Sequence, residues 1–462
     1  MSRTLFILCA VIAIAYASAA NYRLLRPSQN THFLYLAEAF LAGQGELLRT
    51  PPHGNDWASY QTLTLQKQSQ KEYGTQVKAI RIPKVKNLWR TLQGQKLVIP
   101  PQDIKKRHTH YFVSFPPLPA LLMLPLFSLF SFQTLDVLFT MLFAIFNVGL
   151  CYWVLDRFRQ QGYHQRSTHD LLWLSCFFGL GTAHAWCAVL GQVWYTALII
   201  GVTFHWLFLY YAFDMRRPYL AGLALALAFS TRASLVLLAL FFYAQVLYPL
   251  SSQWSRQERI IRCLKFSVIP LLVGLSLLMY NEMRFESYSE FGHSYLAGGQ
   301  LQRIQKYGLF HYIFVPKNLI AAFLLLPMIS FSFPYLKVSW HGMAIQASSP
   351  AFLWLIFALY HTKKTHQAPI HKASYLLAIQ ALILLTLLLF YQNTGWIQYS
   401  WRFILDLLPL LLCILALSHI KLNRWFKVFV VISIVMNMTG AIGFQKSIFR
   451  DTMVNLPILQ PH

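Results

Sequence analysis

Acidic side chains are scarce in this sequence, and those lying outside its apolar runs are the candidates for a general base. The 462 residues include 15 Asp and Glu against 39 Lys and Arg, a formal net charge of +24. A positioned carboxylate takes the proton of an attacking hydroxyl, and nearby cations stabilise a departing anion. The acids in question are Glu38, Glu46, Asp56, Glu72, Asp103, Glu282, Glu286 and Glu290, with Asp406 at the start of an apolar run.

The block from Gly395 to Asp406 places a cation and an acid four residues apart at the edge of an apolar run. In a helix this spacing puts Arg402 and Asp406 on one face, so we expect an ion pair. Charges entering an apolar zone are costly and mark either a functional interior or a structural clamp. Trp396 and Trp401 flank the block, as aromatic residues do at a membrane interface.

A short amphipathic helix is predicted from His32 to Leu41, ended by Gly43 and with Glu38 on its polar side. Such a segment, directly after an apolar run, lies along the outer leaflet of a membrane. Two interpretations stay open: a helix that only rests on the membrane, and a lid whose side chains bind a lipid head group.

The elements that must position these residues are membrane helices. Hydrophobic residues make up 56% of the chain and charged residues 12%, which excludes a soluble globular surface. A crossing needs about 20 apolar residues, and we predict an all-α polytopic fold with about 11 crossings, within a range of about 10 to 13. They lie near 5–20, 135–155, 171–190, 193–213, 218–231, 233–250, 266–281, 350–361, 373–391, 403–420 and 425–444.

Residues 1–20 have the features of a cleaved export signal as well, but we favour a retained first helix. The six cysteines lie in or beside apolar runs without metal-ligand spacing, so neither a disulfide nor a zinc site is expected from them.

Short basic loops set the orientation, because Lys and Arg resist translocation. Loops near 157–166, 216–217 and 256–265 are therefore assigned to the cytoplasm, with the N-terminus inside. That assignment holds only if the proline-containing runs 111–132 and 311–332 do not cross but lie in the interface. We thus treat 1–462 as one membrane domain, with 21–134 and 281–349 as extracytoplasmic regions and 392–402 on the same face.

The first extracytoplasmic region is strongly basic. From Asn21 to His110, Lys and Arg far outnumber Asp and Glu. Dense positive charge favours an anionic partner, such as a lipid phosphate or an acidic glycan, together with membrane lipids in general. Nucleic acid is not expected on the outer face of a membrane.

At several points the chain resembles bacterial polyprenyl-phosphate-dependent glycosyltransferases of the GT-C fold, in the group of the protein O-mannosyltransferases and aminoarabinose transferases (family 39-like). The resemblance also extends to the long first loop and the proline-rich interfacial segment. The resembling stretches are Asn30 to Phe33 with Ala37 and Gly43, Asp56-Trp57, Ser114 to Ala120, Tyr280-Asn281, Arg284-Phe285, Glu290 to Gly292, Ser349-Pro350 and Gly395 to Pro409.

The resemblance implies an inverting hexosyl- or pentosyltransferase of the bacterial inner membrane. It would move a sugar from a polyprenyl-phosphate donor to a lipid, glycan or protein acceptor on the periplasmic face. In that family an Asp opening the first outer loop is taken as the base, but Asn30 stands at the matching place here. We therefore predict Asp56 as the base, with Glu38 second.

The remaining candidate residues follow from the same resemblance. Arg284, Arg402 and His293 are the expected cations for the leaving phosphate. The other substrate-binding candidates are Asn30, His32, Glu290, Trp396 and Asp406. No cofactor and no metal site are predicted, although a divalent cation stays open for this class of enzyme. The resemblance specifies neither the sugar nor the oligomeric state.

Three other functions fit parts of the sequence. A transporter or flippase is compatible with buried Arg402 and Asp406, a polysaccharide polymerase or ligase also joins lipid-linked sugars, and a noncatalytic assembly subunit would explain Asn30. For the transferase we expect Asp56, the helix from Asn30 to Gly43, the Glu290 to His293 loop and Arg402 to converge on one cavity.

Overall fold

The computed structural model describes residues 3–82, 85–296, 299–331, 335–362, 368–446 and 453–456. By the packing of its Cα atoms the chain divides into two compact units. Unit 1 comprises Met1–Thr31, Gln133–Leu271 and Phe310–His462, and unit 2 comprises His32–Phe132 and Leu272–Leu309. Each is described by itself.

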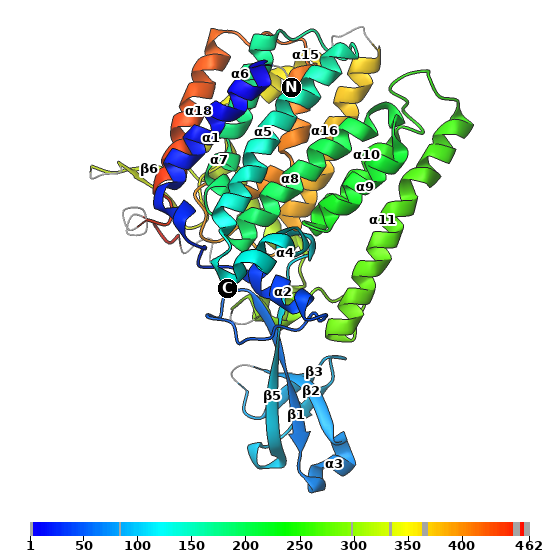
Figure 1. Cartoon of the computed structure of the whole chain (residues 1–462), viewed down its shortest axis with the longest axis vertical. Coiled ribbons are helices and arrows are strands. Elements are labelled where there is room, and N and C mark those ends of the chain that lie inside the picture. Colours follow the sequence, from blue (N-terminus) through cyan, green and yellow to red (C-terminus); the bar gives the residue numbers. More distant parts are fainter. Residues whose placement is uncertain are drawn as a thin grey trace. The chain divides into compact units, whose positions relative to one another are not determined.

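Unit 1 is built almost entirely from apolar helices (Figure 1). Within it α5 packs against α1, α6 and α8, α8 packs against α9, and α18 packs against α6 and α7. A two-stranded sheet joins β6 (Met328–Ile329) to β7 (Leu336–Lys337). The helices are α1 (Arg3–Ala20), α5 (Asp136–Gln160), α6 (Thr168–Leu180), α7 (Ala183–Ala188), α8 (Val193–Ala212), α9 (Pro218–Phe229), α10 (Ala239–Ala244), α13 (Val315–Leu319), α14 (Ile345–Ser348), α15 (Trp354–Thr362), α16 (Ala368–Phe390), α17 (Leu408–Leu417) and α18 (Arg424–Gly443).

Six helices in the described parts of the chain are long and apolar enough to cross a membrane. Each lies at a predicted crossing. The other five predicted crossings correspond to shorter helices or helix pairs, so the count of about 11 is not confirmed. The six are Arg3–Leu25, Asp136–Gln160, Val193–Met215, Arg256–Phe285, Ile370–Phe390 and Arg424–Gly443.

Helix α11 (Arg256–Phe285) gives a direct physical argument for a lipid environment. Only 6% of its most apolar window is buried. Leu271, Leu272 and Met279 are each more than 60% exposed. A row of exposed large apolar side chains along 30 residues is unstable in water and stable in hydrocarbon. The chain is therefore a membrane protein.

The two proline-containing runs predicted to lie in the interface form short helices. Pro116 and Pro117 precede α4 (Leu118–Phe130), which has 13 residues and Pro125 inside it. The second run forms a short 3₁₀ turn, α13 and a π-helical turn, together Tyr312–Leu324. A helix rises 1.5 Å per residue, so about 13 residues reach about 20 Å, less than a hydrocarbon core.

Unit 2 contains a five-stranded antiparallel sheet, and the prediction of an all-α fold is wrong here. The strand order is β4-β3-β2-β1-β5. The side chains of β1 alternate in part between buried and half-buried positions, which is the two-residue period of a strand packed on one face. The strands are β1 (Trp57–Leu65), β2 (Gln76–Arg81), β3 (Leu88–Thr91), β4 (Lys96–Val98) and β5 (Ile104–Val113).

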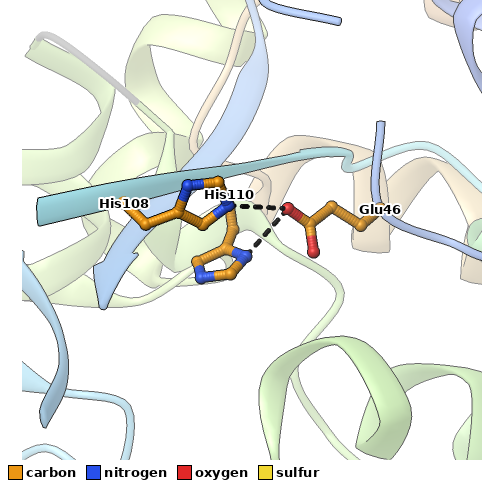
Figure 2. A group of neighbouring side chains, drawn as sticks. All are labelled: Glu46, His108 and His110. Atoms are coloured by element: carbon orange, nitrogen blue, oxygen red, sulfur yellow. Dashed lines mark hydrogen bonds and ion pairs between the residues drawn. The ribbon is translucent and has the colours of Figure 1, made fainter. Parts of the chain in front are cut away.

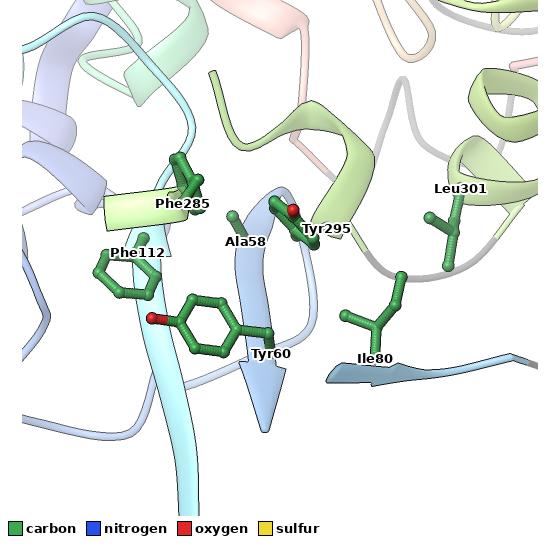
Figure 3. Packing of buried hydrophobic residues seen from close by; sticks show 7 residues of the cluster. All are labelled: Ala58, Tyr60, Ile80, Phe112, Phe285, Tyr295 and Leu301. Atoms are coloured by element: carbon green, nitrogen blue, oxygen red, sulfur yellow. The ribbon is translucent and has the colours of Figure 1, made fainter. Parts of the chain in front are cut away.

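Among the described residues of unit 2, four α-helices and the last turns of α11 accompany this sheet. They are α2 (His32–Leu41), α3 (Lys67–Tyr73), α4 and α12 (Gly299–Tyr307). The bounds of α2 are the predicted ones. A buried cluster joins the sheet to the second segment of the unit, and Figure 3 shows it: Ala58, Tyr60, Ile80 and Phe112 from the strands meet Phe285, Tyr295 and Leu301. The rings of Phe285 and Tyr295 are stacked at 5.2 Å.

Candidate active site

Asp56, the predicted base, directly precedes β1 and has a left-handed backbone conformation. Its φ of 55° is in the left-handed region, which is uncommon for residues other than glycine. Its carboxylate Oδ1 accepts a hydrogen bond from Nε2 of Gln300, the second residue of α12, at 2.8 Å. The hydroxyl of Ser114 donates to the backbone oxygen of Asp56. Backbone strain of this kind is typical of functional sites.

The loop from Glu290 to His293 lies in the same unit and within electrostatic reach of Asp56. Glu290 Oε1 accepts hydrogen bonds from the backbone N–H of Gly292 at 2.7 Å and of Ser294 at 3.3 Å. An isolated bridge pairs Ala58 with Leu296, which holds the end of this loop beside β1. Within unit 2, the predicted approach of Asp56 to the Glu290–His293 loop is therefore present.

The surroundings of His293 disfavour the positive charge that was predicted for it. Burial lowers its pKa, and Arg284 acts in the same direction, while Glu290 and Asp56 oppose them. Its Nδ1 is buried without a hydrogen-bond partner among the described residues. A neutral ring can donate or accept a hydrogen bond but cannot supply a positive charge at neutral pH.

Aromatic side chains pack around Trp57, the residue that follows Asp56. The ring of His32, the first residue of α2, stacks on the indole of Trp57 at 3.7 Å with an interplanar angle of 6°. His32 Nε2 lies 2.9 Å from the carbonyl oxygen of Asn55. A carbonyl only accepts, so Nε2 carries the hydrogen and donates. Phe115 meets the His32 ring edge-on at 5.9 Å. The predicted residue His32 thus fixes the start of α2 against the strand that follows Asp56.

Two other predicted residues of unit 2 are held by protein partners. Glu38 Oε1 accepts a hydrogen bond from Arg49 Nε at 2.8 Å, and the Glu38 side chain is 13% exposed. Arg284 donates from Nη1 to the Val113 carbonyl oxygen and from Nη2 to Asn281 Oδ1, each at 2.8 Å, with its guanidinium 3.9 Å from the Tyr280 ring. Both side chains therefore join segments of the unit.

Unit 1 holds Arg402 in a buried position without a carboxylate partner. Arg402 is 5% exposed, and Nη1 donates to the carbonyl oxygen of Gly395 at 3.0 Å. Its Nε is buried without a hydrogen-bond partner among the described residues. None of the ion pairs in the described parts of the chain includes it. A buried guanidinium in this state attracts an anion.

The predicted ion pair between Arg402 and Asp406 is wrong. Residues Arg402–Asp406 form a 3₁₀ helix rather than an α-helix, which changes the facing of residues four apart. Asp406 instead accepts two hydrogen bonds from Arg232, at 3.0 Å from Nε and 2.7 Å from Nη2. Ser234 also donates to it at 2.8 Å. Asp406 therefore forms a bidentate ion pair with Arg232, which lies on another segment of unit 1.

Two further predicted residues also lie in unit 1. The carbonyl oxygen of Asn30 accepts from the N–H of Val193, the first residue of α8, at 3.2 Å, and its side-chain Oδ1 is buried without a partner among the described residues. Trp396 is 38% exposed, and its ring lies 4.9 Å from the rings of both Trp340 and His341.

The sequence prediction missed Gln300 and Arg232. Arg232 had a signal, because it is a lone charge between the apolar runs 218–231 and 233–250. A charge in such a place has a partner in the folded protein. Gln300 had none, since an amide in a polar segment is too common to indicate a site.

Comparison with known proteins gives one structural likeness. The chain resembles the crystal structure of the Archaeoglobus fulgidus oligosaccharyltransferase, which was tethered by a disulfide bond to an acceptor peptide containing the NVT sequon. The match covers 96% of this chain at 11% sequence identity and a TM-score of 0.47. The chain spans 56% of that protein's length. No family model and no curated protein matches the chain. A likeness of this strength carries no argument about activity.

Proposed function

We propose that the chain is an inverting membrane glycosyltransferase that takes a sugar from a polyprenyl-phosphate donor. The observation that carries the proposal is the cluster in unit 2, where Asp56 lies within electrostatic range of His293 and its carboxylate is held by Gln300. The other support is the set of helices suited to a membrane, where a polyprenyl donor is dissolved. The proposed location is the bacterial inner membrane, with chemistry on the periplasmic face.

In the proposed reaction an acceptor hydroxyl attacks the anomeric carbon of the sugar. Asp56 takes the hydroxyl proton as the new carbon–oxygen bond forms. The bond from the anomeric carbon to the phosphate oxygen breaks, and the polyprenyl phosphate leaves with the bonding electrons. One displacement at one carbon inverts its configuration. His293, whose positive charge is disfavoured, acts as a hydrogen-bond partner for substrate hydroxyls rather than as an acid.

Asp56 is the better choice for the base among the two predicted carboxylates. Glu38 is committed to an ion pair with Arg49, with 2.8 Å between Arg49 Nε and Glu38 Oε1. Asp56 accepts a hydrogen bond from the side-chain amide of Gln300, which orients its carboxylate, and it lies within electrostatic range of His293.

Arg402 is proposed to bind a lipid-borne phosphate, on the geometry of unit 1 alone. Its guanidinium lacks a carboxylate partner in the described parts of the chain and keeps an unpaired Nε. Gln398 Oε1 accepts from the Arg402 backbone N–H at 3.1 Å, and Gln398 itself donates to the carbonyl oxygens of His341 and Thr394. These bonds hold the arginine in place before any anion binds, so little ordering cost remains.

A second candidate function is the movement of a lipid-linked sugar across the membrane without bond cleavage. The Arg232–Asp406 pair, whose aspartate is buried and whose arginine is 19% exposed, favours it, because charged pairs inside membrane proteins often lie on substrate paths. The two functions differ in their product, since only the transferase releases polyprenyl phosphate.

The test is to incubate the purified protein in lipid nanodiscs with a panel of polyprenyl-phosphate-linked monosaccharides and a mixture of glycan and peptide acceptors. We expect at least one donor to be consumed, with release of polyprenyl phosphate. If no donor releases polyprenyl phosphate, while reconstituted vesicles move a lipid-linked sugar across the bilayer, the transferase proposal is wrong and the transport function is supported.

A further inference from the structure

Two histidines and one glutamate form a cluster in unit 2 that the proposed chemistry does not use. Glu46, His108 and His110 each present one ligand atom, and these atoms all lie within 4.8 Å of one another. Glu46 Oε1 is 2.8 Å from His110 Nδ1 and 3.8 Å from His108 Nε2. Figure 2 shows one carboxylate oxygen facing both imidazole rings.

The fold brings these three side chains together through two separate constraints. His108 and His110 are two residues apart on β5, so both project from the same face of the strand. The segment that carries Glu46 is fixed beside β5 by a hydrogen bond from the N–H of Leu47 to the carbonyl oxygen of Tyr111 at 2.9 Å. The two rings meet edge-on at 4.6 Å.

We propose that Glu46, His108 and His110 bind a divalent transition-metal ion of the zinc class. Two imidazoles and one carboxylate are the ligand set of many zinc sites that keep a fourth position for water. Imidazole nitrogen selects zinc-like ions over Mg²⁺ and Ca²⁺, which take oxygen ligands. This site goes beyond the proposed glycosyl transfer and does not depend on it.

The hydrogen bonds around His110 fit a metal ligand. His110 Nε2 lies 2.8 Å from the hydroxyl of Thr62 on β1. When Nε2 donates its hydrogen to Thr62, the lone pair of Nδ1 is left for a metal on the Glu46 side. A second partner that fixes the ring and its tautomer in this way is a usual feature of metal-binding histidines.

Small movements complete the geometry. A tetrahedral ion with bonds of about 2.0 to 2.1 Å needs ligand atoms about 3.3 Å apart. Glu46 Oε1 and His110 Nδ1 are already closer than that, whereas His108 Nε2 lies 3.8 Å from Glu46 Oε1 and within 4.8 Å of the His110 ligand atom, so the His108 side chain has to rotate inward. The His108 side chain is 65% exposed and free to rotate, whereas His110 is 16% exposed and held by packing.

A bound ion would link the segment after α2 to an edge of the sheet. Strand β5 is the last strand in the order, and residues 105–108 on it are exposed. A metal held by β5 and by Glu46 closes the chain segment between α2 and β1 onto this edge. We therefore assign the ion a stabilising role within unit 2.

The test is to measure Zn²⁺ binding to the full-length protein by equilibrium dialysis with metal analysis. Wild type should bind one more Zn²⁺ per chain than a His108→Ala/Glu46→Gln double variant, and Mg²⁺ should not compete. His419→Ala removes an exposed imidazole elsewhere and should change nothing. X-ray absorption of the wild-type complex should show imidazole ligands at about 2.0 to 2.1 Å.

The single variant His108→Ala guards against misfolding, because this exposed side chain can be removed with little effect on packing. It should weaken Zn²⁺ binding at least tenfold while leaving the metal-free unfolding temperature unchanged. Equal Zn²⁺ binding by wild type and the double variant would overturn the proposal, as would displacement of the ion by Mg²⁺. Neither result depends on transferase activity.

Discussion

Two buried arginines that look alike in the sequence have different surroundings. Arg284 and Arg402 both lie at the edge of an apolar run, and both were predicted to bind phosphate. The guanidinium of Arg284 donates to protein acceptors from all three of its nitrogens, whereas that of Arg402 donates to one carbonyl oxygen. A sequence shows the charge but not the acceptors around it, so the distinction needed the folded chain.

Replacing Arg402 with glutamine should therefore affect binding of an anion. Hydrogen bonds to charged groups contribute about 1.5 to 3 kcal/mol, which corresponds to a rise of about 10- to 100-fold in KM for a phosphate-bearing donor. Steady-state kinetics of Arg402→Gln measure this. Arg284→Gln is the matched control. It should lower the unfolding temperature, and it should change KM less than Arg402→Gln does. An unchanged KM in Arg402→Gln would contradict the assignment.

The roles predicted for the site residues stay predictions, but the structure shows which of these residues lie close together and which partners local geometry gives them. Asp56 and the Glu290–His293 loop do lie close together in unit 2. The predicted Arg402–Asp406 pair required an α-helix. These residues form a 3₁₀ helix, and Asp406 pairs with Arg232 instead. The cationic role predicted for His293 is disfavoured because burial lowers its pKa, and burial is not visible in the sequence.

At the scale of elements, the apolar helices were predictable and the sheet was not. The helix His32–Leu41 has a regular apolar face, and its bounds came out as expected. Strands β1 to β5 lie in a stretch whose many charges indicated a loop. Much of β5 is exposed, and its basic residues conceal the two-residue period that identifies a strand.

The loop between α5 and α6 gives unit 1 a predictable dependence on pH. His164 Nε2 donates to the carbonyl oxygen of Leu155, and His164 Nδ1 accepts from the N–H of Arg166. A proton added to Nδ1 would point at the N–H of Arg166, so the charged form of the His164 ring is disfavoured. Burial, together with the nearby Arg166 and Arg159, lowers the pKa of His164 to about 4, although the bond to Leu155 opposes the shift.

Because the pKa of His164 is below its unfolded value, the unfolded state binds a proton first as pH falls. Stability should be unaffected above about pH 6.5 and should decrease below it, by about 1 kcal/mol at pH 5.5. Thermal unfolding at pH 7.5 and 5.5 measures the effect. In His164→Asn the decrease in stability between pH 7.5 and 5.5 should be smaller than in wild type. In His169→Asn, an exposed control on α6, it should equal that of wild type. An equal decrease in both variants would contradict the assignment.

At the scale of the whole molecule, composition alone identified a membrane protein. Six of the predicted crossings have helices of sufficient length and apolarity in the described parts of the chain. Two of the remaining five are shorter because a polar residue ends the helix early: Ser230 after α9 and Ser418 after α17. Apolar runs interrupted in this way still look continuous to a hydropathy window.

The charge of the short loops predicts which segments face the outside of the cell. One additional cysteine, introduced either at Lys96 on β4 or at Arg157 near the end of α5, provides the test, because both positions are polar. A membrane-impermeant maleimide applied to intact spheroplasts should label the cysteine at 96 and leave the one at 157 unlabelled until the membrane is permeabilised. The parent protein, whose six free cysteines are buried or half-buried, is the control. Labelling of both in intact spheroplasts would contradict the orientation.

The most direct measurement of the central claim is sugar transfer by Asp56→Asn. This change keeps the size of the side chain and removes the base, so the rate of transfer from the preferred polyprenyl-phosphate donor should fall about 10²- to 10⁴-fold at equal protein abundance. Glu72→Gln, which neutralises an exposed carboxylate on α3, should transfer at the wild-type rate. Transfer by Asp56→Asn at the wild-type rate would show that Asp56 is not the base.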